Sequence, residues 1–496
     1  MKAQAPWGAL LAIVVAGLAA RVGVLAAADI GLPVGGDAAF WGQRALELRE
    51  GLWIGSHPPG YPLVGLALGS VLGLDPGVAL QAVALVSGSL APAALGLAAN
   101  ELAGRRAGIM AALLAACLPA LAFASMRVEP TALLALGIGL ASWLAARAAR
   151  RGAPADALVA GLVASATVLT KENGLVASGL IAVALPFATT QRSVAVTLAF
   201  VLGFIPGVAT QRALDAGFSE WTGITVTKAE LPLDDVRRML ASGEIPHALV
   251  EAGAAERQGT GEALRQIAEP ARSGASRAIL FLGVQLKRLA LAMGSWILLV
   301  PTALVAGVAK RDPPSRIFLA QALALVPCVL VVVQPRHVDV ALLGLAVSAA
   351  IAVVGRPLWQ AVVPVALVAT QLAYATWSME WEELVRARRC AEAELAVAER
   401  LRPQLPTSGD WCSTAAWFPF RLGLPGGRCL LEEVRVGESR AFVVDRGAIV
   451  GLRDRGDTLA LALDCGPAEH EGCIADTAVC IVTNAGLGPT PLRWRW

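Results

Sequence analysis

Three short turns along the chain each place a basic side chain beside an acidic one, between two apolar runs. The turns read "SMRVEP", "LTKENG" and "VQPRHVD", and their charged residues are Arg127, Glu129, Lys171, Glu172, Arg336, His337 and Asp339. Ionisable groups at the depth of a bilayer are costly and tend to mark binding sites or pathways. One such turn is explained most simply as a solvated loop, but three on one face favour a site for an anionic lipid headgroup. In such a site the cations hold a phosphate and a carboxylate acts as a base.

A longer segment, 29–76, follows the first apolar run and adds an acid and a histidine. Asp37 comes after two glycines, and His57 precedes two prolines. Taken alone, Asp37 is explained by a helix N-cap. The apolar stretch 61–73 is too short to span a bilayer comfortably, so we expect a helix along the interface. The aromatic belt of that interface is expected to hold Trp41, Trp53 and Tyr61.

The elements that position these residues are membrane helices. The 496 residues are 56 % hydrophobic and only 16 % charged, which fits no soluble average. Apolar runs of about 17 to 22 residues recur, each long enough to cross a hydrocarbon core of ~30 Å. They predict a polytopic α-helical membrane protein with about eleven transmembrane helices, near 7–28, 77–99, 107–125, 130–149, 156–170, 174–190, 193–211, 289–309, 316–334, 338–355 and 357–377.

Composition also excludes several classes of function. A net charge of +3 spread over this length is no nucleic-acid footprint. The sequence contains no Walker A loop, Rossmann fingerprint or paired CxxC site. We therefore expect no nucleic-acid partner and disfavour soluble nucleotide enzymes.

Basic residues in alternate loops orient the array. They are Lys2, Arg105, Arg106, Arg147, Arg150, Arg151, Arg192, Lys310, Arg311, Arg316 and Arg356. The positive-inside rule places these loops in the cytoplasm. The three charged turns, segment 29–76, loop 212–288 and everything after about 377 then face the periplasm or exterior. A cleavable signal ending near Ala26 to Ala28 is the alternative for the first run, and Arg21 inside that run argues against it.

The last predicted span ends at 377, so we expect two domains: a transmembrane domain, 1–377, and an extracytoplasmic domain, 378–496. Loop 212–288 shows amphipathic patterns near 233–242, 244–257 and 261–269, which predict helices at the membrane surface. The tail begins with a helical run and continues with short β-type runs, so a small α/β domain is expected. Its six cysteines are Cys390, Cys412, Cys429, Cys465, Cys473 and Cys480. At least two disulfides are expected in an oxidising compartment, with free thiols or a metal as alternatives.

An ordered set of fragments resembles a known superfamily. The fragments are Arg21, Asp37, "RALELREG", "HPPGYPLVGLALGSVLG", "LAANELAGRRAG", "SMRVEP", "LTKENG" and "PRH". In order and on a common face, they are similar to GT-C glycosyltransferases, specifically the bacterial branch of the protein O-mannosyltransferase and aminoarabinose transferase family. The second acid that relatives carry near the aspartate is missing, since Ala38, Ala39, Phe40 and Trp41 follow Asp37. No DxD metal motif is present, so we predict no metal ligands and regard a divalent cation as doubtful.

The resemblance implies an enzyme of the bacterial inner (cell) membrane. Its donor is a polyprenyl-phosphate-linked sugar, taken from among the membrane lipids, and its acceptor is a protein, lipid or glycan on the external face. Transfer inverts the anomeric centre in one displacement. The implied roles are catalytic for Asp37 and Glu129, donor phosphate binding for Lys171, Arg336, His57 and His337, and acceptor binding or orienting for Arg127 and Glu172.

Two other functions remain open at this point. A lipid or solute transporter also needs polar groups in a helical bundle, but it needs access from both faces, whereas the charges here gather on one. A non-catalytic protein that binds lipid-linked glycans is the other alternative, because of the missing second acid.

Overall fold

The structure, a computed structural model, describes most of the first half of the chain and separate parts of the second. The described residues are 6–28, 38–49, 57–171, 173–189, 193–222, 231–243, 266, 268–293, 315–323, 339–354, 379–404, 411–413, 417–422, 441–445, 462–465 and 479–482. Five of the candidate site and aromatic-belt residues lie outside them, Asp37, Trp53, Glu172, Arg336 and His337, as do the tail cysteines Cys429 and Cys473.

The described residues between 7 and 222 form ten helices, and all but the polar second one follow apolar runs of the sequence. They are α1 (Trp7–Ala27), α2 (Ala38–Arg49), α3 (Gly60–Leu72), α4 (Pro76–Ala103), α5 (Arg105–Ala116), α6 (Pro119–Met126), α7 (Thr131–Arg151), α8 (Pro154–Val168), α9 (Asn173–Ala188) and α10 (Ser193–Thr222). Local signals set several ends. Asp75 caps α4, since its carboxylate accepts hydrogen bonds from the backbone N–H groups of Gly77 at 2.8 Å and Val78 at 3.4 Å. Gly152 ends α7 in the left-handed conformation, with φ of 61°.

Several of these helices are long and apolar enough to cross a membrane. Within the described residues these are Trp7–Ala27, Pro76–Ala103, Thr131–Arg151 and Ser193–Ala216. Arg105–Ala116 and Ala120–Met126 are apolar enough only when taken together, and they meet at a bend of 59°. The predicted continuous span 107–125 is therefore interrupted, because Pro119 starts a new helix after Cys117 and Leu118. The chain is a polytopic helical membrane protein, and the number of eleven spans stays a prediction.

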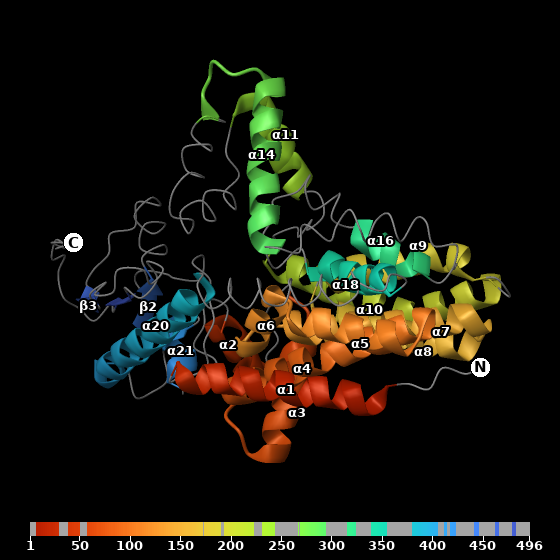
Figure 1. Cartoon of the computed structure of the whole chain (residues 1–496). Helices are drawn as coiled ribbons and strands as arrows, with labels where there is room; N and C mark the ends of the chain where they lie inside the picture. The colour runs from red at the N-terminus through yellow and green to blue at the C-terminus, as the bar shows by residue number, and fades with distance from the viewer. Residues whose placement is uncertain are drawn as a thin grey trace.

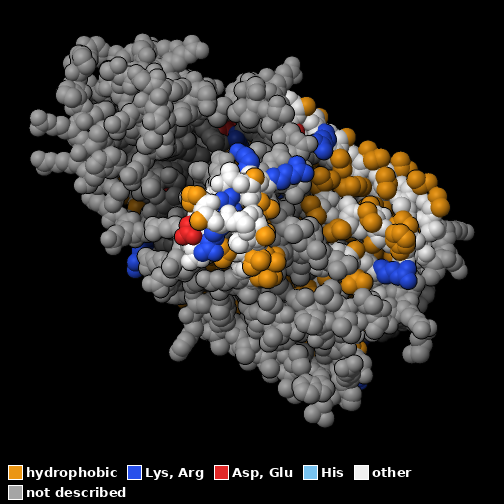
Figure 2. Space-filling view, turned by 90° about the horizontal axis from the view of Figure 1, so that it is seen from above, with side chains coloured by type: hydrophobic (Ala, Val, Ile, Leu, Met, Phe, Trp, Pro, Cys, Tyr) orange, Lys and Arg blue, Asp and Glu red, His pale blue; other side chains and the backbone are white. Residues whose placement is uncertain are grey.

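The outer surface of the bundle agrees with a lipid environment. Along α10 the side chains of Val194, Leu198, Leu202 and Ile205 are exposed by 71, 57, 64 and 50 %. Figure 2 shows hydrophobic side chains spread over the right-hand part of the described surface, with Lys and Arg at its borders. Such an apolar surface is stable in lipid and costly in water.

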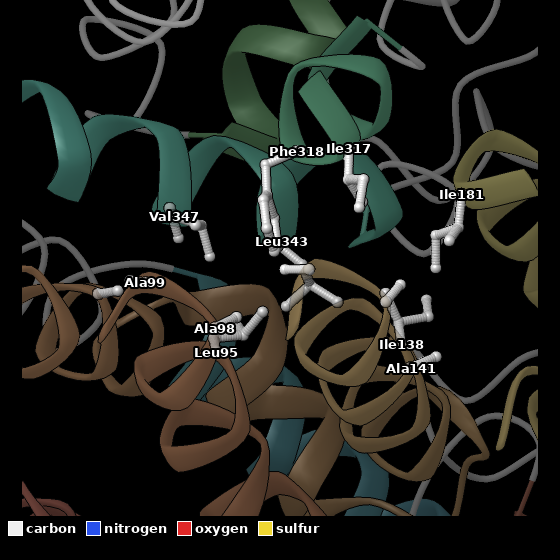
Figure 3. Packing of buried hydrophobic residues seen from close by; sticks show 14 of the residues in the cluster. Leu95, Ala98, Ala99, Ile138, Ala141, Ile181, Ile317, Phe318, Leu343 and Val347 are labelled. Atoms are coloured by element: carbon white, nitrogen blue, oxygen red, sulfur yellow. The ribbon is translucent and has the colours of Figure 1, made fainter. Parts of the chain in front are cut away.

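The bundle core is built mostly from small side chains. Alanines dominate the buried cluster that joins α4, α7, α8 and α9 to two later helices, α16 (Arg316–Leu323) and α18 (Asp339–Val353). Figure 3 shows Leu95 of α4 and Ile138 of α7 below Phe318 of α16 and Leu343 of α18. Small residues let helix backbones approach closely in membranes.

The segment between α10 and α16 departs from the predicted boundaries. α10 continues through Thr222, beyond the predicted start of the loop at 212. A helix α11 (Leu231–Ser242) coincides with the first amphipathic pattern, and α14 (Gly274–Met293) begins well before the predicted span at 289. In Figure 1, α11 and α14 stand out from the bundle. The other two amphipathic patterns of this loop fall almost wholly outside the described residues.

The described parts of the tail form two α-helices, a short 3-10 helix and a sheet. These are α20 (Met379–Leu401), η4 (Arg402–Gln404), β1 (Trp411–Ser413), α21 (Trp417–Arg421), β2 (Ala441–Asp445), β3 (Ala462–Cys465) and β4 (Val479–Val482). The strand order is β1-β2-β4-β3, with β1 parallel to β2 and β4 antiparallel to both β2 and β3. Cys390 on α20 is disulfide-bonded. A cross-linked extracytoplasmic domain with at least two disulfides stays a prediction.

Candidate functional site

Three turns that are far apart in the sequence meet at one end of the bundle. The backbone N–H of Gly60, at the start of α3, donates a hydrogen bond to the carbonyl oxygen of Leu169 at 2.6 Å. Two residues later, the Nζ of Lys171 donates to Oγ1 of Thr131 at 2.8 Å. Because Thr131 starts α7 directly after "RVEP", the turns that carry His57, Glu129 and Lys171 are tied together.

Tyr61 links Glu129 to this junction. Its hydroxyl is fully buried and donates to the carbonyl oxygen of Leu80 on α4 at 2.9 Å. Burial raises the pKa of Tyr61 well above its ordinary value, and the negative charge of Glu129 raises it further, against a hydrogen bond from the Glu129 backbone. Tyr61 is therefore a neutral donor at physiological pH, and Glu129 lies beside it.

His57 lies in an aromatic cluster on α2 and α3. Its ring meets those of Phe40 and Trp41 edge to face, with centroids 5.0 and 5.9 Å apart, and Trp41 meets Tyr61 in the same way at 5.8 Å. Edge-to-face contacts of this kind stabilise a fixed arrangement of rings. The helix α2 that carries Phe40 and Trp41 begins at Ala38, the residue after Asp37.

The expected aromatic belt is wrong for two of its members. Trp41 is 5 % exposed and Tyr61 is fully buried, whereas belt residues face the lipid interface. Both rings pack with Leu80, Val83 and Val128 in a common cluster. The two rings are buried in contacts between helices, because α2 and the turn before α7 pack against α3 and α4. Trp53 lies outside the described residues.

Arg127 is held by the element that precedes it. Its guanidinium lies over the ring of Phe123, 4.6 Å from the centroid. The carbonyl oxygen of Met126 accepts a hydrogen bond from the Nε2 of Gln81 at 3.2 Å. The end of α6 is thus fixed against α4. The acceptor-binding role of Arg127 stays a prediction, and so do the roles of Asp37, Glu172, Arg336 and His337, which lie outside the described residues.

A buried ion pair on α2 was not anticipated as part of the site. Nη1 of Arg44 lies 2.7 Å from Oε2 of Glu47, and the two side chains are 7 and 3 % exposed. The Arg44 guanidinium also lies 5.2 Å from the ring centroid of Phe40, and Gln43 is fully buried. The spacing of an arginine and a glutamate three apart in "RALELREG" is the signal that could have indicated the pair.

The first span reaches the same junction through Arg21. This buried side chain donates from Nε to Oγ of Ser125 at 2.6 Å and from Nη1 to the carbonyl oxygen of Gly17 at 2.9 Å. Ser125 is two residues before Arg127. A charge in the middle of the first apolar run therefore positions the turn that carries Glu129.

No cluster of three or more His, Cys, Asp or Glu side chains suited to a metal ion occurs among the residues that the structure describes. The described part of the site offers instead a lysine, a histidine and a glutamate from three turns. This set of groups suits an anionic ligand with a nearby hydroxyl or amine.

A comparison with protein families finds a match over part of the chain. Residues 56–209 match the family described as dolichyl-phosphate-mannose-protein mannosyltransferase. This segment contains His57, Glu129 and Lys171. The match confirms the predicted resemblance to GT-C glycosyltransferases of the O-mannosyltransferase branch, and the predicted class of enzyme, a glycosyltransferase.

Particular solved structures are similar to the chain as well. ArnT from Cupriavidus metallidurans in the apo state aligns at 16 % identity and a TM-score of 0.46, over 95 % of this chain and 97 % of that one. The same protein bound to undecaprenyl phosphate aligns at 14 % identity and a TM-score of 0.46, over 97 % of this chain and 99 % of that one. The Archaeoglobus fulgidus oligosaccharyltransferase, in complex with Zn and sulfate, aligns at 14 % identity and a TM-score of 0.49, over 83 % of this chain and 61 % of that one. No curated protein matches the sequence.

Proposed function

We propose that the chain transfers a sugar from a polyprenyl-phosphate-linked donor to an acceptor on the external face of the membrane. The observation that carries this proposal is the junction of the three turns. It ties together the turns that carry His57, Glu129 and Lys171, and the His57 ring contacts Phe40 and Trp41 at the start of α2, the helix that follows Asp37 in sequence. The matched family, named for a lipid-phosphate sugar as donor, supports the same choice of substrate.

The chemistry requires one base and a cationic phosphate site. Asp37 accepts the proton of the acceptor hydroxyl or amine while that group attacks the anomeric carbon. A new bond forms from the acceptor to this carbon, and the bond to the phosphate oxygen breaks with inversion. The polyprenyl phosphate leaves with the electron pair, and Lys171, His57, Arg336 and His337 stabilise its negative charge. Glu129 orients the acceptor.

The test compares Asp37→Asn with a matched aspartate of the same external segment. Full-length protein in nanodiscs is supplied with undecaprenyl phosphate carrying labelled mannose or aminoarabinose and with a cell-envelope extract as the source of acceptor, and both labelled acceptor and released lipid phosphate are measured. Asp37→Asn is expected to lower kcat by ~10²- to 10⁴-fold, because the isosteric amide cannot take the proton. Asp75→Asn is the control, since asparagine caps a helix as well as aspartate does, and its turnover is expected to equal that of the wild type.

The alternatives give different results. Near-wild-type turnover of Asp37→Asn would refute Asp37 as the base. A wild-type protein that binds these lipids but transfers no sugar supports the non-catalytic binding protein, and one that moves them across the membrane unchanged supports the transporter.

A further inference from the structure

The tail of the chain contacts two helices that lie next to the site, α1 and α2. In Figure 1, α20 and α21 lie beside the end of α1 that is farther from the N-terminus. The segment that carries Asp37 begins where α1 ends, after Ala28, and is followed by α2 from Ala38. Contacts from the tail reach both of these flanking elements.

Helix α20 holds the end of α1. Nη1 of Arg388 donates a hydrogen bond to the carbonyl oxygen of Ala28 at 3.0 Å, and its Nε pairs with Oε1 of Glu392 at 2.8 Å. One turn earlier on α20, Leu384 is 2 % exposed and packs with Leu25 of α1 and Met126 of α6. The guanidinium is thus oriented by one pair and caps the last carbonyl groups of α1.

Helix α21 holds the beginning of α2. The ring of Phe420, 8 % exposed, lies directly on Gly42, and a Cβ atom added to Gly42 would overlap it. Glycine at this position therefore permits the close approach of the two helices. Phe418 of α21 is also fully buried.

The two tail helices act as one unit. Arg421 of α21 pairs with Glu394 of α20 through Nη2 at 2.7 Å and Nε at 2.8 Å, and the two side chains are 6 and 18 % exposed. Two N–H groups on one carboxylate give a directional, partly buried ion pair. A movement of α20 that breaks the contact of Arg388 with α1 would therefore also move α21, whose Phe420 packs on Gly42 of α2.

We propose that the unit of α20 and α21 anchors the end of α1 and the beginning of α2, the two described helices that flank Asp37 in sequence, and so supports transfer by holding α2 in place. The positioning role rests on the proposed function, whereas the anchoring does not. The tail then supplies positioning residues, Arg388 and Phe420, and no group that touches substrate. Its role in the reaction is geometric, because small displacements of a catalytic group cost rate rather than donor binding.

The first test removes the contact on α1. Arg388→Gln is compared with Arg389→Gln, the same change on the neighbouring exposed arginine, and with Arg388→Lys, which retains a donor. Hydrogen exchange of the α2 amides and donor transfer are measured on the full chain in nanodiscs. Arg388→Gln is expected to speed exchange in α2 and to lower kcat about tenfold, with KM for the undecaprenyl-phosphate sugar changed by less than about twofold. Arg389→Gln is expected to match the wild type, and Arg388→Lys to recover most of the loss.

The second test uses the contact on α2. Gly42→Ala is expected to lower kcat by up to ~10²-fold through the shifted helix, and adding Phe420→Ala is expected to restore most of it, since the smaller side chain makes room. Gly179→Ala on α9 is the control, as a Cβ atom there meets nothing within 4 Å.

The results separate the two proposals. Unchanged α2 exchange in both Arg388→Gln and Gly42→Ala would overturn the anchoring. Faster exchange with unchanged kcat would overturn the positioning role. If α2 exchanges faster in these variants but the wild-type protein transfers no sugar, the anchoring is supported and only the proposed function is refuted.

Discussion

The bundle core and the outer junction of turns are stabilised in different ways. In the core, α8 and α10 touch through backbone atoms, because a Cβ atom on Gly161 would overlap the carbonyl oxygen of Phe200, and one on Gly203 would overlap that of Leu158. At the junction, directional contacts hold the turns: the backbone hydrogen bond from Gly60 to Leu169, the ring edges around His57 and the hydrogen bond from Lys171, beside a buried ion pair on α2.

The core contacts mainly stabilise the helix bundle, whereas the junction contacts mainly fix the orientation of side chains. Close packing of small residues stabilises helices in lipid without directional contacts. A buried ion pair is a poor source of net stability, because the desolvation of two charges offsets most of their attraction. The charges near α2 are therefore better explained by the orientation that they impose on the neighbours of Asp37.

The largest expected effect tests the buried pair. Glu47→Leu is expected to destabilise the protein by about 3–5 kcal/mol, because it leaves the Arg44 charge buried without its carboxylate. Thermal unfolding in detergent measures the change. The control is Glu269→Leu, which breaks a pair with Arg272 at the same spacing of three residues, but with side chains 55 and 34 % exposed, and should cost below about 1 kcal/mol. Equal losses would mean that burial does not distinguish the two pairs.

The next effect tests the core. Gly161→Val is expected to cost about 3 kcal/mol, since the added side chain meets a backbone oxygen that cannot move aside. The amount of monodisperse protein after solubilisation measures it, against Gly179→Val in open space. Tolerance of Gly161→Val would show that α8 and α10 are not closely packed.

The smallest effect tests a directional contact alone. Thr131→Val keeps the shape of the side chain and removes the oxygen that accepts from Lys171. A lysine that loses this bond is no longer held in one orientation, so kcat is expected to fall about tenfold. The unfolding temperature is expected to change little, because Lys171 is only half-buried and water can replace the lost acceptor. Thr189→Val is the matched control, because the Thr189 hydroxyl donates within α9 to Leu185. A kcat unchanged in Thr131→Val would mean that Lys171 needs no such positioning.

Much of the fold follows from local sequence. The apolar runs predict α1, α4, α7 and α10 because their length and hydropathy suit a bilayer. The common face of "SMRVEP" and "LTKENG" follows from alternating loop charges, and the contact of Lys171 with Thr131 agrees with it. The end of α10 and the start of α14 could not be placed this way, since α10 runs from apolar into polar sequence and α14 from amphipathic into apolar sequence without a break.

The sequence by itself determined the membrane helices, the short turns between them and the charged residues that those turns present, because hydropathy and loop charge act locally along the chain. Only the tertiary structure decided that Trp41 and Tyr61 are buried, that Arg44 pairs with Glu47 out of water, and that Phe420 packs on Gly42. These features depend on which helix covers which face. Residues nearly 380 positions apart, such as Gly42 and Phe420, carry no local signal of their contact, and close packing of specific surfaces alone brings them together.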